Sequence, residues 1–426
     1  MISRAHSRSQ IAVVTLALLA LTALTTFMVQ QRRARSADID AVPLFAMPAV
    51  LHTESEVRDG DIAFYSKRVS EDPEGALDRL TLASLLFARS RASGSSSDLA
   101  RAESLARESV ALRSQRNGHA FEVLASVLMA RHAFAEARVF AARADSLEPE
   151  TASHLSLLGE IELELGEYDA AARHFTAVHL DGKQFTVTAR LARWYELTGH
   201  ADIARALLKR AIIDVNKRDD LPREQAAWFH YRLGELELRT NHLDAADVAF
   251  RRALQRNPDD VRALGGLARS ALARGEWKRV IEFGDRALAV QIDPTILGSL
   301  STASAALGDT AAAVGYANAM SVSALTQPGA IHRAWGLFLL DHGSTAERAE
   351  VLRRARMELR ERHDVYGHDL LAWALYRAGR TTEARREMTA ALSQSTEDAL
   401  LTAHAAALGL GATAAVGETV TGTSSR

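Results

Sequence analysis

Residues 226–260 have the sequence AAWFHYRLGELELRTNHLDAADVAFRRALQRNPDD, in which large apolar and small residues recur at fixed distances. The recurring positions are Leu233, Gly234, Leu243, Ala246, Phe250 and Ala253. The same spacing is found on the N-terminal side at Leu158, Gly159, Tyr168, Ala171, Phe175 and Val178. On the C-terminal side it is found at Leu267, Ala268, Trp277, Val280, Gly284 and Ala287. Self-similarity of this kind indicates a repeat architecture.

The repeated pattern resembles the tetratricopeptide repeat (TPR) family, whose units of about 34 residues each form two antiparallel helices. Units begin near Ala76, Gly118, Ala152, Phe185, Ala227, Val261, Pro294, Gly329 and Val365. The turn inside each unit is placed at His132, Gly166, Gly199, Asn241, Gly275, Gly308, Gly343, Gly379 and Gly409. A close-packing alanine of the second helix falls at Ala102, Ala137, Ala171, Ala204, Ala246, Ala313 and Ala384. Prolines separate several of the units, where they can end a helix without breaking one.

The resemblance implies an all-α fold, a TPR-like α-solenoid in which about nine helix-turn-helix units form a right-handed superhelix after one N-terminal transmembrane helix. Each helix pair is apolar on two faces, so that stacked neighbours bury a continuous core. The predicted boundaries are an N-terminal tail (1–10), an apolar segment (11–29), a linker (30–55), the solenoid (56–410) and a flexible C-terminal tail (411–426).

Three segments depart from the repeat. Residues 87–98 (FARSRASGSSSD) lengthen the turn of the first unit and have the Ser/Gly composition of a surface loop. Asn216–Gln225 (NKRDDLPREQ) adds polar residues between two later units. Both are expected to be tolerated loop insertions, with a partner contact as the alternative. Asp61–Ser70 is expected to form a single capping helix.

The composition excludes several classes of protein. With 51 Lys and Arg against 53 Asp and Glu, the formal net charge is −2, which argues against general nucleic-acid binding. The absence of cysteine excludes disulfides, thiolate metal sites and a cysteine nucleophile.

Ile11 to Val29 (IAVVTLALLALTALTTFMV) contains no charged residue. As a helix it would span roughly 28 Å, close to the thickness of a bilayer's hydrocarbon core. This apolar run is longer than that of a typical signal peptide, so we predict an uncleaved single-pass anchor, with a cleaved signal as the alternative. The soluble part is then expected to be periplasmic or extracytoplasmic.

No catalytic signature is present: the sequence has no HExxH, no phosphate-binding glycine loop, no GxSxG and no CxxC. The nearest candidate for metal binding is His363, Asp364, His368 and Asp369, which straddles a unit boundary and is interpreted as a surface loop. We therefore predict no catalytic residues, no metal, no cofactor and no enzymatic activity.

In the TPR family, peptides bind a concave groove lined by the first helix of each unit. Carrying those positions over gives a predicted partner-binding set of Arg193, Trp228, Tyr231, Arg232, Glu235, Arg262, Arg269, Arg333, Tyr366, Trp373 and Tyr376. Core packing is the alternative for each aromatic residue. The sites of the family's Lys/Asn carboxylate clamp are not Lys or Asn here, and two of them are Arg190 and Arg232, which leaves an anionic ligand possible.

The leading functional hypothesis is a non-enzymatic scaffold, tethered to a membrane, that binds a protein or peptide partner in its groove and does not bind nucleic acid. One alternative is an accessory or specificity subunit of an envelope enzyme complex. The other is a soluble TPR regulator, if the N-terminal segment is cleaved or is not an anchor.

Overall fold

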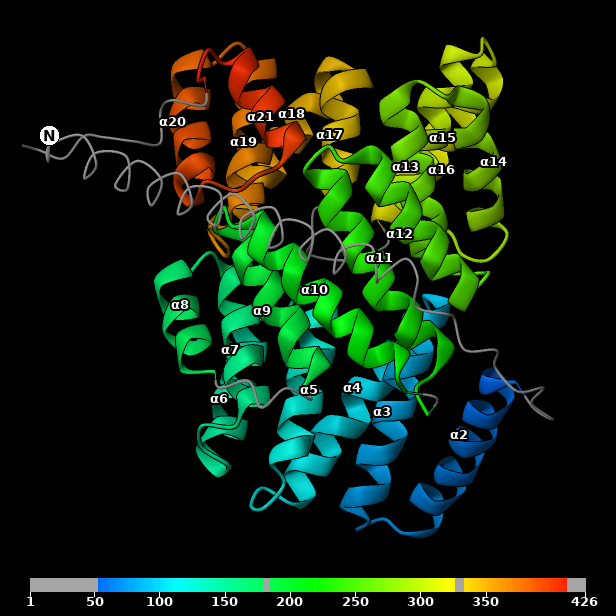
Figure 1. Cartoon of the computed structure of the whole chain (residues 1–426). Helices are drawn as coiled ribbons and strands as arrows, with labels where there is room; N and C mark the ends of the chain where they lie inside the picture. The colour runs from blue at the N-terminus through cyan, green and yellow to red at the C-terminus, as the bar shows by residue number, and fades with distance from the viewer. Residues whose placement is uncertain (1–52, 179–183, 219, 326–332, 412–426) are drawn as a thin grey trace, which may run out of the picture. The chain divides into compact units, whose positions relative to one another are not determined.

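The computed structural model describes residues 53–178, 184–218, 220–325 and 333–411, all of which lie in the unit formed by residues 48–426 (Figure 1). Within those ranges every regular element is a helix. None of these helices is both long and apolar enough to cross a membrane. The anchor predicted at residues 11–29 and most of the tail predicted at 411–426 lie outside the described residues.

The described residues form nine consecutive helix pairs, α3–α4 to α19–α20, with α2 before them and α21 after them (Figure 1). The first pairs are α3 (Ala76–Ser93) with α4 (Ser96–Leu112), α5 (Gly118–Ala130) with α6 (Phe134–Leu147), and α7 (Ala152–Leu165) with α8 (Tyr168–Ala177). The middle pairs are α9 (Phe185–Leu197) with α10 (Ala201–Asn216), α11 (Arg223–Arg239) with α12 (Leu243–Arg256), and α13 (Val261–Arg274) with α14 (Trp277–Leu288). The last pairs are α15 (Pro294–Ala306) with α16 (Thr310–Leu325), α17 (Arg333–His342) with α18 (Thr345–Glu358), and α19 (Val365–Arg377) with α20 (Thr381–Ala391). The single elements are α2 (Glu54–Glu71), the 3-10 turn η1 (Leu392–Gln394) and α21 (Ala399–Ala407).

The turns lie where the sequence predicts them. A positive φ is found at His132, Gly166, Gly199, Asn241, Gly275, Gly308, Gly379 and Gly409. Gly343 lies in the turn between α17 and α18, but its φ is not positive. There Ser344 caps α18 in a capping box with Glu347, so no left-handed residue is needed.

Small residues let the helices approach closely at the centre of each pair. The predicted close-packing alanines are fully buried, apart from slight exposure of Ala313. Phe250 of α12 is also fully buried, and its ring lies against Gly234 of α11 and Gly266 of α13. Because a methyl group at either glycine would overlap the ring, these two positions set the spacing of three helices.

The insertion at residues 87–98 does not form the predicted loop. It extends α3 to Ser93 and starts α4 at Ser96, so that both helices are longer than their counterparts in the next pair. Gly94 ends α3 in the left-handed conformation, and the Ser95 hydroxyl caps α4 by accepting a hydrogen bond from the Asp98 amide. The Ser/Gly run therefore provides two helix caps in place of a flexible loop. The second insertion is partly helical as well, since α10 ends at Asn216 and α11 begins at Arg223.

The last repeats contact repeats that lie about 200 residues earlier in the sequence. The His363 amide donates to the Leu165 carbonyl oxygen at 2.8 Å, and the Val365 amide donates to the Tyr168 hydroxyl at 2.9 Å. Further along the same contact, the Thr396 hydroxyl donates to the Leu197 carbonyl oxygen. We call this contact, between residues 165–201 and 363–397, the closure contact.

The closure contact corrects the prediction for His363–Asp369, which was a surface loop. The segment instead joins α18 to α19 and packs against α7 and α8. Asp364 is buried and caps α19 by accepting from the Gly367 amide, while Asp369 is fully buried within α19.

A second long-range contact ties α2 to the start of α11. Arg58 forms an ion pair with Glu224 at 2.5 Å, and the Glu54 carboxylate accepts from the Arg223 amide at 2.8 Å. Since Pro222 precedes α11 and has no side-chain oxygen to cap it, Glu54 supplies the cap from a helix more than 160 residues earlier.

Candidate functional site

A cavity of about 1240 Å³ lies between the repeats, and its walls come from most of the chain. Its lining draws on many helices of the described array, among them α3, α4, α9, α11, α13, α15, α17, α19 and α21, together with the turn after α5. The volume exceeds the ~300–1,000 Å³ typical of small-molecule pockets. A cavity of this size, formed by helices far apart in sequence, is suited to binding an extended ligand.

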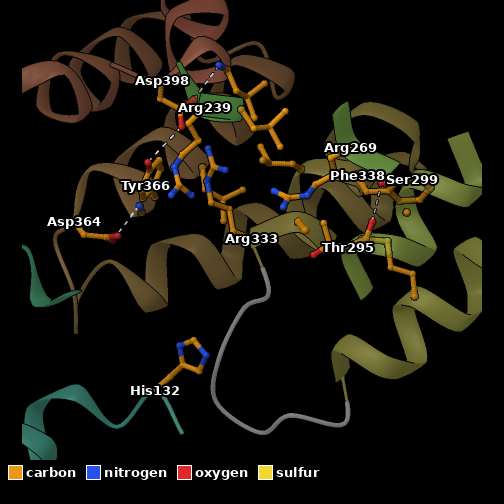
Figure 2. Close-up of a pocket in the computed structure, with 18 of the residues that line it drawn as sticks. His132, Arg239, Arg269, Thr295, Ser299, Arg333, Phe338, Asp364, Tyr366 and Asp398 are labelled. Carbon is orange, nitrogen blue, oxygen red and sulfur yellow. Dashed lines mark hydrogen bonds between the residues drawn. The ribbon is translucent and has the colours of Figure 1, made fainter. Parts of the chain in front are cut away.

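One end of the cavity holds four arginines around one tyrosine. Arg193, Arg239, Arg269 and Arg333 come from α9, α11, α13 and α17, and Tyr366 comes from the first turn of α19. Figure 2 shows Arg239, Arg269 and Arg333 directed toward the region beside the Tyr366 ring. The guanidinium carbons of Arg193 and Arg333 lie 5.7 and 4.8 Å from the centre of that ring. We call these five residues the arginine site.

Buried carboxylates hold the arginines in position from behind. Glu196 accepts from Arg239 at 2.6 Å, forms an ion pair with Arg193 at 3.1 Å, and accepts from Arg232 at 3.2 Å. Burial alone would raise the pKa of Glu196, but the three guanidinium groups hold that pKa well below its ordinary value. Glu196 therefore stays ionised and fixes the position of three cations.

Two further carboxylates complete this support. Glu235 pairs with Arg269 and Arg239, and these cations lower its pKa against the opposing effect of burial. Asp369 pairs with Arg333 and with the His404 ring at 2.7 Å, and its pKa is likewise lowered despite burial. Since all three carboxylates are at least nine-tenths buried, they lie behind the guanidinium groups and leave the cations facing the cavity.

The guanidinium groups have donors that the protein does not use. Glu235 takes up part of the donors of Arg239 and Arg269, and Asp369 takes up one donor of Arg333. Two buried nitrogens, Arg239 Nη2 and Arg333 Nε, have no hydrogen-bond acceptor among the described residues. Buried donors without an acceptor cost free energy, so an anionic ligand with several oxygens fits this end of the cavity.

The wall next to the arginine site is apolar. It includes Leu272 of α13 and Leu337 and Phe338 of α17, and Phe338 and Met320 lie against Gly298 of α15. In Figure 2, Thr295 and Ser299 of α15 lie on this side, next to Phe338. The Ser299 hydroxyl donates to the Thr295 carbonyl oxygen of its own helix at 3.0 Å, which leaves the hydroxyl oxygen able to accept.

The remaining charged residues in the lining form a looser group. Arg362 forms ion pairs with Asp364 at 2.8 Å, with Glu164 at 3.3 Å and with Glu358 at 3.6 Å. Burial raises the pKa of Glu358 to about 7, with Asp364 adding to the effect and Arg362 opposing it. Arg91, from the extended end of α3, packs on the Phe87 ring and has no carboxylate partner in the described part of the chain.

The structure brings part of the predicted partner-binding set together. The predicted residues that line the large cavity are Arg193, Arg269, Arg333 and Tyr366. Those that line a neighbouring pocket of about 350 Å³ are Arg193, Trp228, Tyr231 and Arg232. The two pockets share Arg193 and Arg239. The two arginines at the clamp positions, Arg190 and Arg232, are paired with Glu160 and Glu196.

The other predicted residues are placed differently. Glu235 lies behind the arginine site, as described above. Arg262 forms an ion pair with Asp260 at 2.7 Å and covers the Tyr231 ring. Trp373 and Tyr376 stack on each other and line neither pocket. Trp373 also stacks on His404, so this pair contributes to the packing of α19 and α21.

Four arginines of the cavity were missed from the sequence: Arg91, Arg131, Arg239 and Arg362. Helical spacing could have identified Arg239, which follows Arg232 by seven positions and Glu235 by four on the same helix face. No local signal identifies Arg91 or Arg362, because an insertion and the closure contact place them. Within the described residues no group of three or more His, Asp and Glu is arranged to hold a metal ion.

Comparison with known proteins agrees with this architecture. Residues 231–295 match a family model described as tetratricopeptide repeat. None of the curated proteins matches the chain. Among solved structures, a monomeric mutant of human IFIT1 with Gppp-AAAA is 14% identical, covering 79% of this chain and 76% of that one at a TM-score of 0.51. Pseudomonas aeruginosa pilF is 15% identical, covering 53% and 97% at 0.40. A tetratricopeptide repeat protein from Parabacteroides merdae is 14% identical, covering 60% and 97% at 0.41.

Proposed function

This chain is a tetratricopeptide repeat protein, and we propose that it is a non-enzymatic scaffold which binds a protein or peptide partner in its internal cavity. The observation that carries the proposal is the cavity itself, which is larger than a typical small-molecule pocket and is lined, among the described residues, by side chains from thirteen helices. Most charged side chains in the described lining form ion pairs, and none of those described is positioned as a nucleophile next to a general base, which supports binding over catalysis.

The shape of the lining supports a chain-like partner. The arginine site offers hydrogen-bond donors at one end, and the wall of α13, α15 and α17 offers apolar contacts and hydroxyl acceptors. A peptide segment presents carbonyl oxygens, amide hydrogens and side chains along its length, so one such segment can use both surfaces. Arginine and tyrosine are also enriched at the centres of protein interfaces.

A cavity-filling substitution tests this proposal. Ala273 lies in the last turn of α13, is exposed and lines the cavity, so Ala273→Trp fills the space without replacing a core residue. The matched control is Ala305→Trp, at an exposed position near the end of α15 that does not line the cavity. We expect a crosslinking pull-down with the full chain to recover a partner with wild type and with Ala305→Trp. Recovery with Ala273→Trp should fall at least tenfold, and equal recovery by both variants would refute binding in the cavity.

We further propose that residues 11–29 tether the solenoid to a membrane, with the repeats on the periplasmic or extracytoplasmic side. The support is the uncharged apolar run of membrane-spanning length between flanking arginines. Within the described residues the first helix is α2, which begins at Glu54, and its capping box uses only Thr53 and Glu56.

A further inference from the structure

We infer that the arginine site is the anchor for an acidic side chain of the partner, and that the neighbouring apolar wall takes a large apolar side chain close to it in sequence. This inference rests on the proposed function and names the class of peptide that the cavity selects. The partner segment is therefore acidic and apolar at once, with a Glu or Asp and a Leu or Phe within a few residues of each other.

The lining charge points to an anion. Among the described residues in the cavity wall, arginines outnumber carboxylates. The arginines are Arg91, Arg131, Arg193, Arg239, Arg269, Arg333 and Arg362. The carboxylates are Glu358, Asp364 and Asp398. The carboxylates that balance the arginine site lie buried behind it, so a ligand in the cavity meets the cations first.

The arginine site is also built to hold an oxyanion in a fixed place. Its side chains enter from five different helices and are oriented by ion pairs to buried acids, so little side-chain freedom is lost on binding. The guanidinium groups of Arg193 and Arg333 both lie over the ring of Tyr366, and the Tyr366 hydroxyl donates to Asp398 at 3.3 Å. The unused donors of Arg239 and Arg333 can each donate to an oxygen of a ligand carboxylate, which accepts.

The apolar contact lies one helical turn from the cations on two separate helices. On α13, Leu272 follows Arg269 by three positions, and on α17, Leu337 follows Arg333 by four. Residues at these spacings share a helix face, so each helix presents a cation and an apolar side chain in adjacent places. A ligand that satisfies both therefore carries its charge and its apolar group a short distance apart.

Four arginines could also bind the phosphorylated end of a single-stranded nucleic acid. The structure favours this ligand less than an acidic peptide. Single-stranded nucleic acid is usually held by aromatic stacking along a basic groove, whereas here the wall beyond Tyr366 is built mainly of Leu, Gly and hydroxyl residues. Three carboxylates also share the lining, and the chain as a whole has a net charge of −2.

The test is an array of short synthetic peptides of random composition, probed with the purified full chain. Two further probes are a 5′-triphosphorylated oligoadenylate and the best array peptide with its acidic residues changed to amides. We expect the bound peptides to be enriched in Glu or Asp next to Leu or Phe. The amide peptide should bind at least tenfold more weakly.

Two variants assign the effect to the arginine site. Arg269→Gln should weaken the binding of acidic peptides at least tenfold. Arg193→Lys keeps the charge but loses the planar guanidinium group, so it should weaken their binding by a smaller factor. The control is Arg353→Gln on the outer face of α18, where the arginine is exposed and pairs only with Glu350. Circular dichroism and thermal unfolding of each variant show whether the fold is kept.

The outcomes separate the inference from the proposed function. Peptides that bind without an acidic preference, or equally well to Arg269→Gln and Arg353→Gln, would overturn the inference and leave peptide binding intact. An array with no bound peptide would overturn both. Tighter binding of the oligoadenylate than of any peptide, lost in Arg269→Gln, would assign the site to nucleic acid and reject the acidic-peptide anchor.

Discussion

At the scale of single residues, the ring of Phe250 shows how closely the helices of neighbouring repeats approach. Gly266→Ala would place a methyl group inside the van der Waals radius of this fully buried ring, which has no free space to move into. We expect the free energy of unfolding to fall by about 1–3 kcal/mol, the usual cost of overpacking. Thermal and urea unfolding followed by circular dichroism measure the change.

The control for this prediction is Gly315→Ala on α16, where a new methyl group would meet nothing within 4 Å. Because alanine is a better helix former than glycine, this variant should be neutral or more stable by about 0.5–1 kcal/mol. An equal loss of stability in both variants would show that the Phe250 contact does not set the helix spacing.

Glu358 gives a pH prediction whose sign follows from burial. Its folded pKa of about 7 lies above the ordinary value of 4.5, so the folded state binds more protons than the unfolded state between these pH values. This residue therefore makes the protein lose stability as the pH rises from about 4.5 to 7. Glu358→Gln should raise the melting temperature at pH 8 and leave it nearly unchanged at pH 4. A melting temperature that is lower at pH 8 would mean that the ion pair with Arg362 outweighs burial.

Residue patterns in the sequence predict the positions of the repeats well, because the residues that define each unit lie within that unit. A left-handed turn favours glycine or asparagine and a close helix contact favours alanine or glycine, and both preferences are local. Residues whose role depends on a distant partner were assigned less well. Tyr366 was predicted to face the groove and does line the cavity, whereas Trp373, two turns further along α19, packs against His404. Whether an aromatic residue of α19 lines the cavity or packs in the interior depends on its contacts with α21, and these contacts cannot be predicted from the sequence of α19 alone.

At the scale of helices, the cap that α2 provides for α11 makes a long-range prediction. Glu54→Ala removes the acceptor for the Arg223 amide and should cost about 0.5–2 kcal/mol, as the loss of a helix cap does. Hydrogen exchange followed by mass spectrometry should show faster exchange in the first turn of α11. Glu71→Ala is the control at the other end of α2, where the exposed carboxylate pairs only with Lys67. Unchanged exchange in α11 of the Glu54→Ala variant would contradict the capping role.

The Ser/Gly insertion at residues 87–98 was interpreted as a loop from its composition. Serine and glycine favour turns, but they are also the residues that cap helices, and composition alone does not distinguish a loop from two caps in succession. The structure uses Gly94 and Ser95 as caps and lengthens α3, which brings Arg91 to the cavity. An insertion that a single repeat tolerates therefore contributes to a site formed by the whole array.

At the scale of the whole solenoid, the closure contact brings repeats from the middle and the end of the chain together around the cavity. Gly166→Ala tests it, since a methyl group there would overlap the backbone of His363 and Asp364. Gly275→Ala is the control, because Gly275 has the same left-handed conformation but no distant segment within reach. Both variants should lose about 1–2 kcal/mol through backbone strain.

The two glycine variants should differ in one observable. Only Gly166→Ala should speed hydrogen exchange at the His363 and Val365 amides, whose acceptors are on α7 and α8. It should also weaken the binding of any cavity ligand, since Tyr366 follows directly after the disrupted contact. Equal exchange in both variants would mean that the closure contact does not depend on the turn at Gly166.

Membrane tethering is the last prediction, and it concerns the chain as a whole. An uncharged apolar segment of this length transfers favourably into a bilayer, and it is flanked by arginines that remain in the aqueous phase. The full chain should therefore sediment with membranes, resist release by high salt and be released by detergent. Deletion of residues 11–29 should leave a folded protein in the soluble fraction, because α2 starts with its own capping box.

The orientation needs its own measurement. A reporter enzyme that is active only outside the cytoplasm, fused after Val50, should be active if the solenoid is extracytoplasmic and inactive if it is cytoplasmic. Salt-extractable full chain would contradict the anchor, and a shortened chain on membranes or in the soluble fraction would indicate cleavage. The distinction bears on the cavity as well, because it determines whether the acidic, apolar segments that fit the cavity belong to envelope proteins or to cytoplasmic ones.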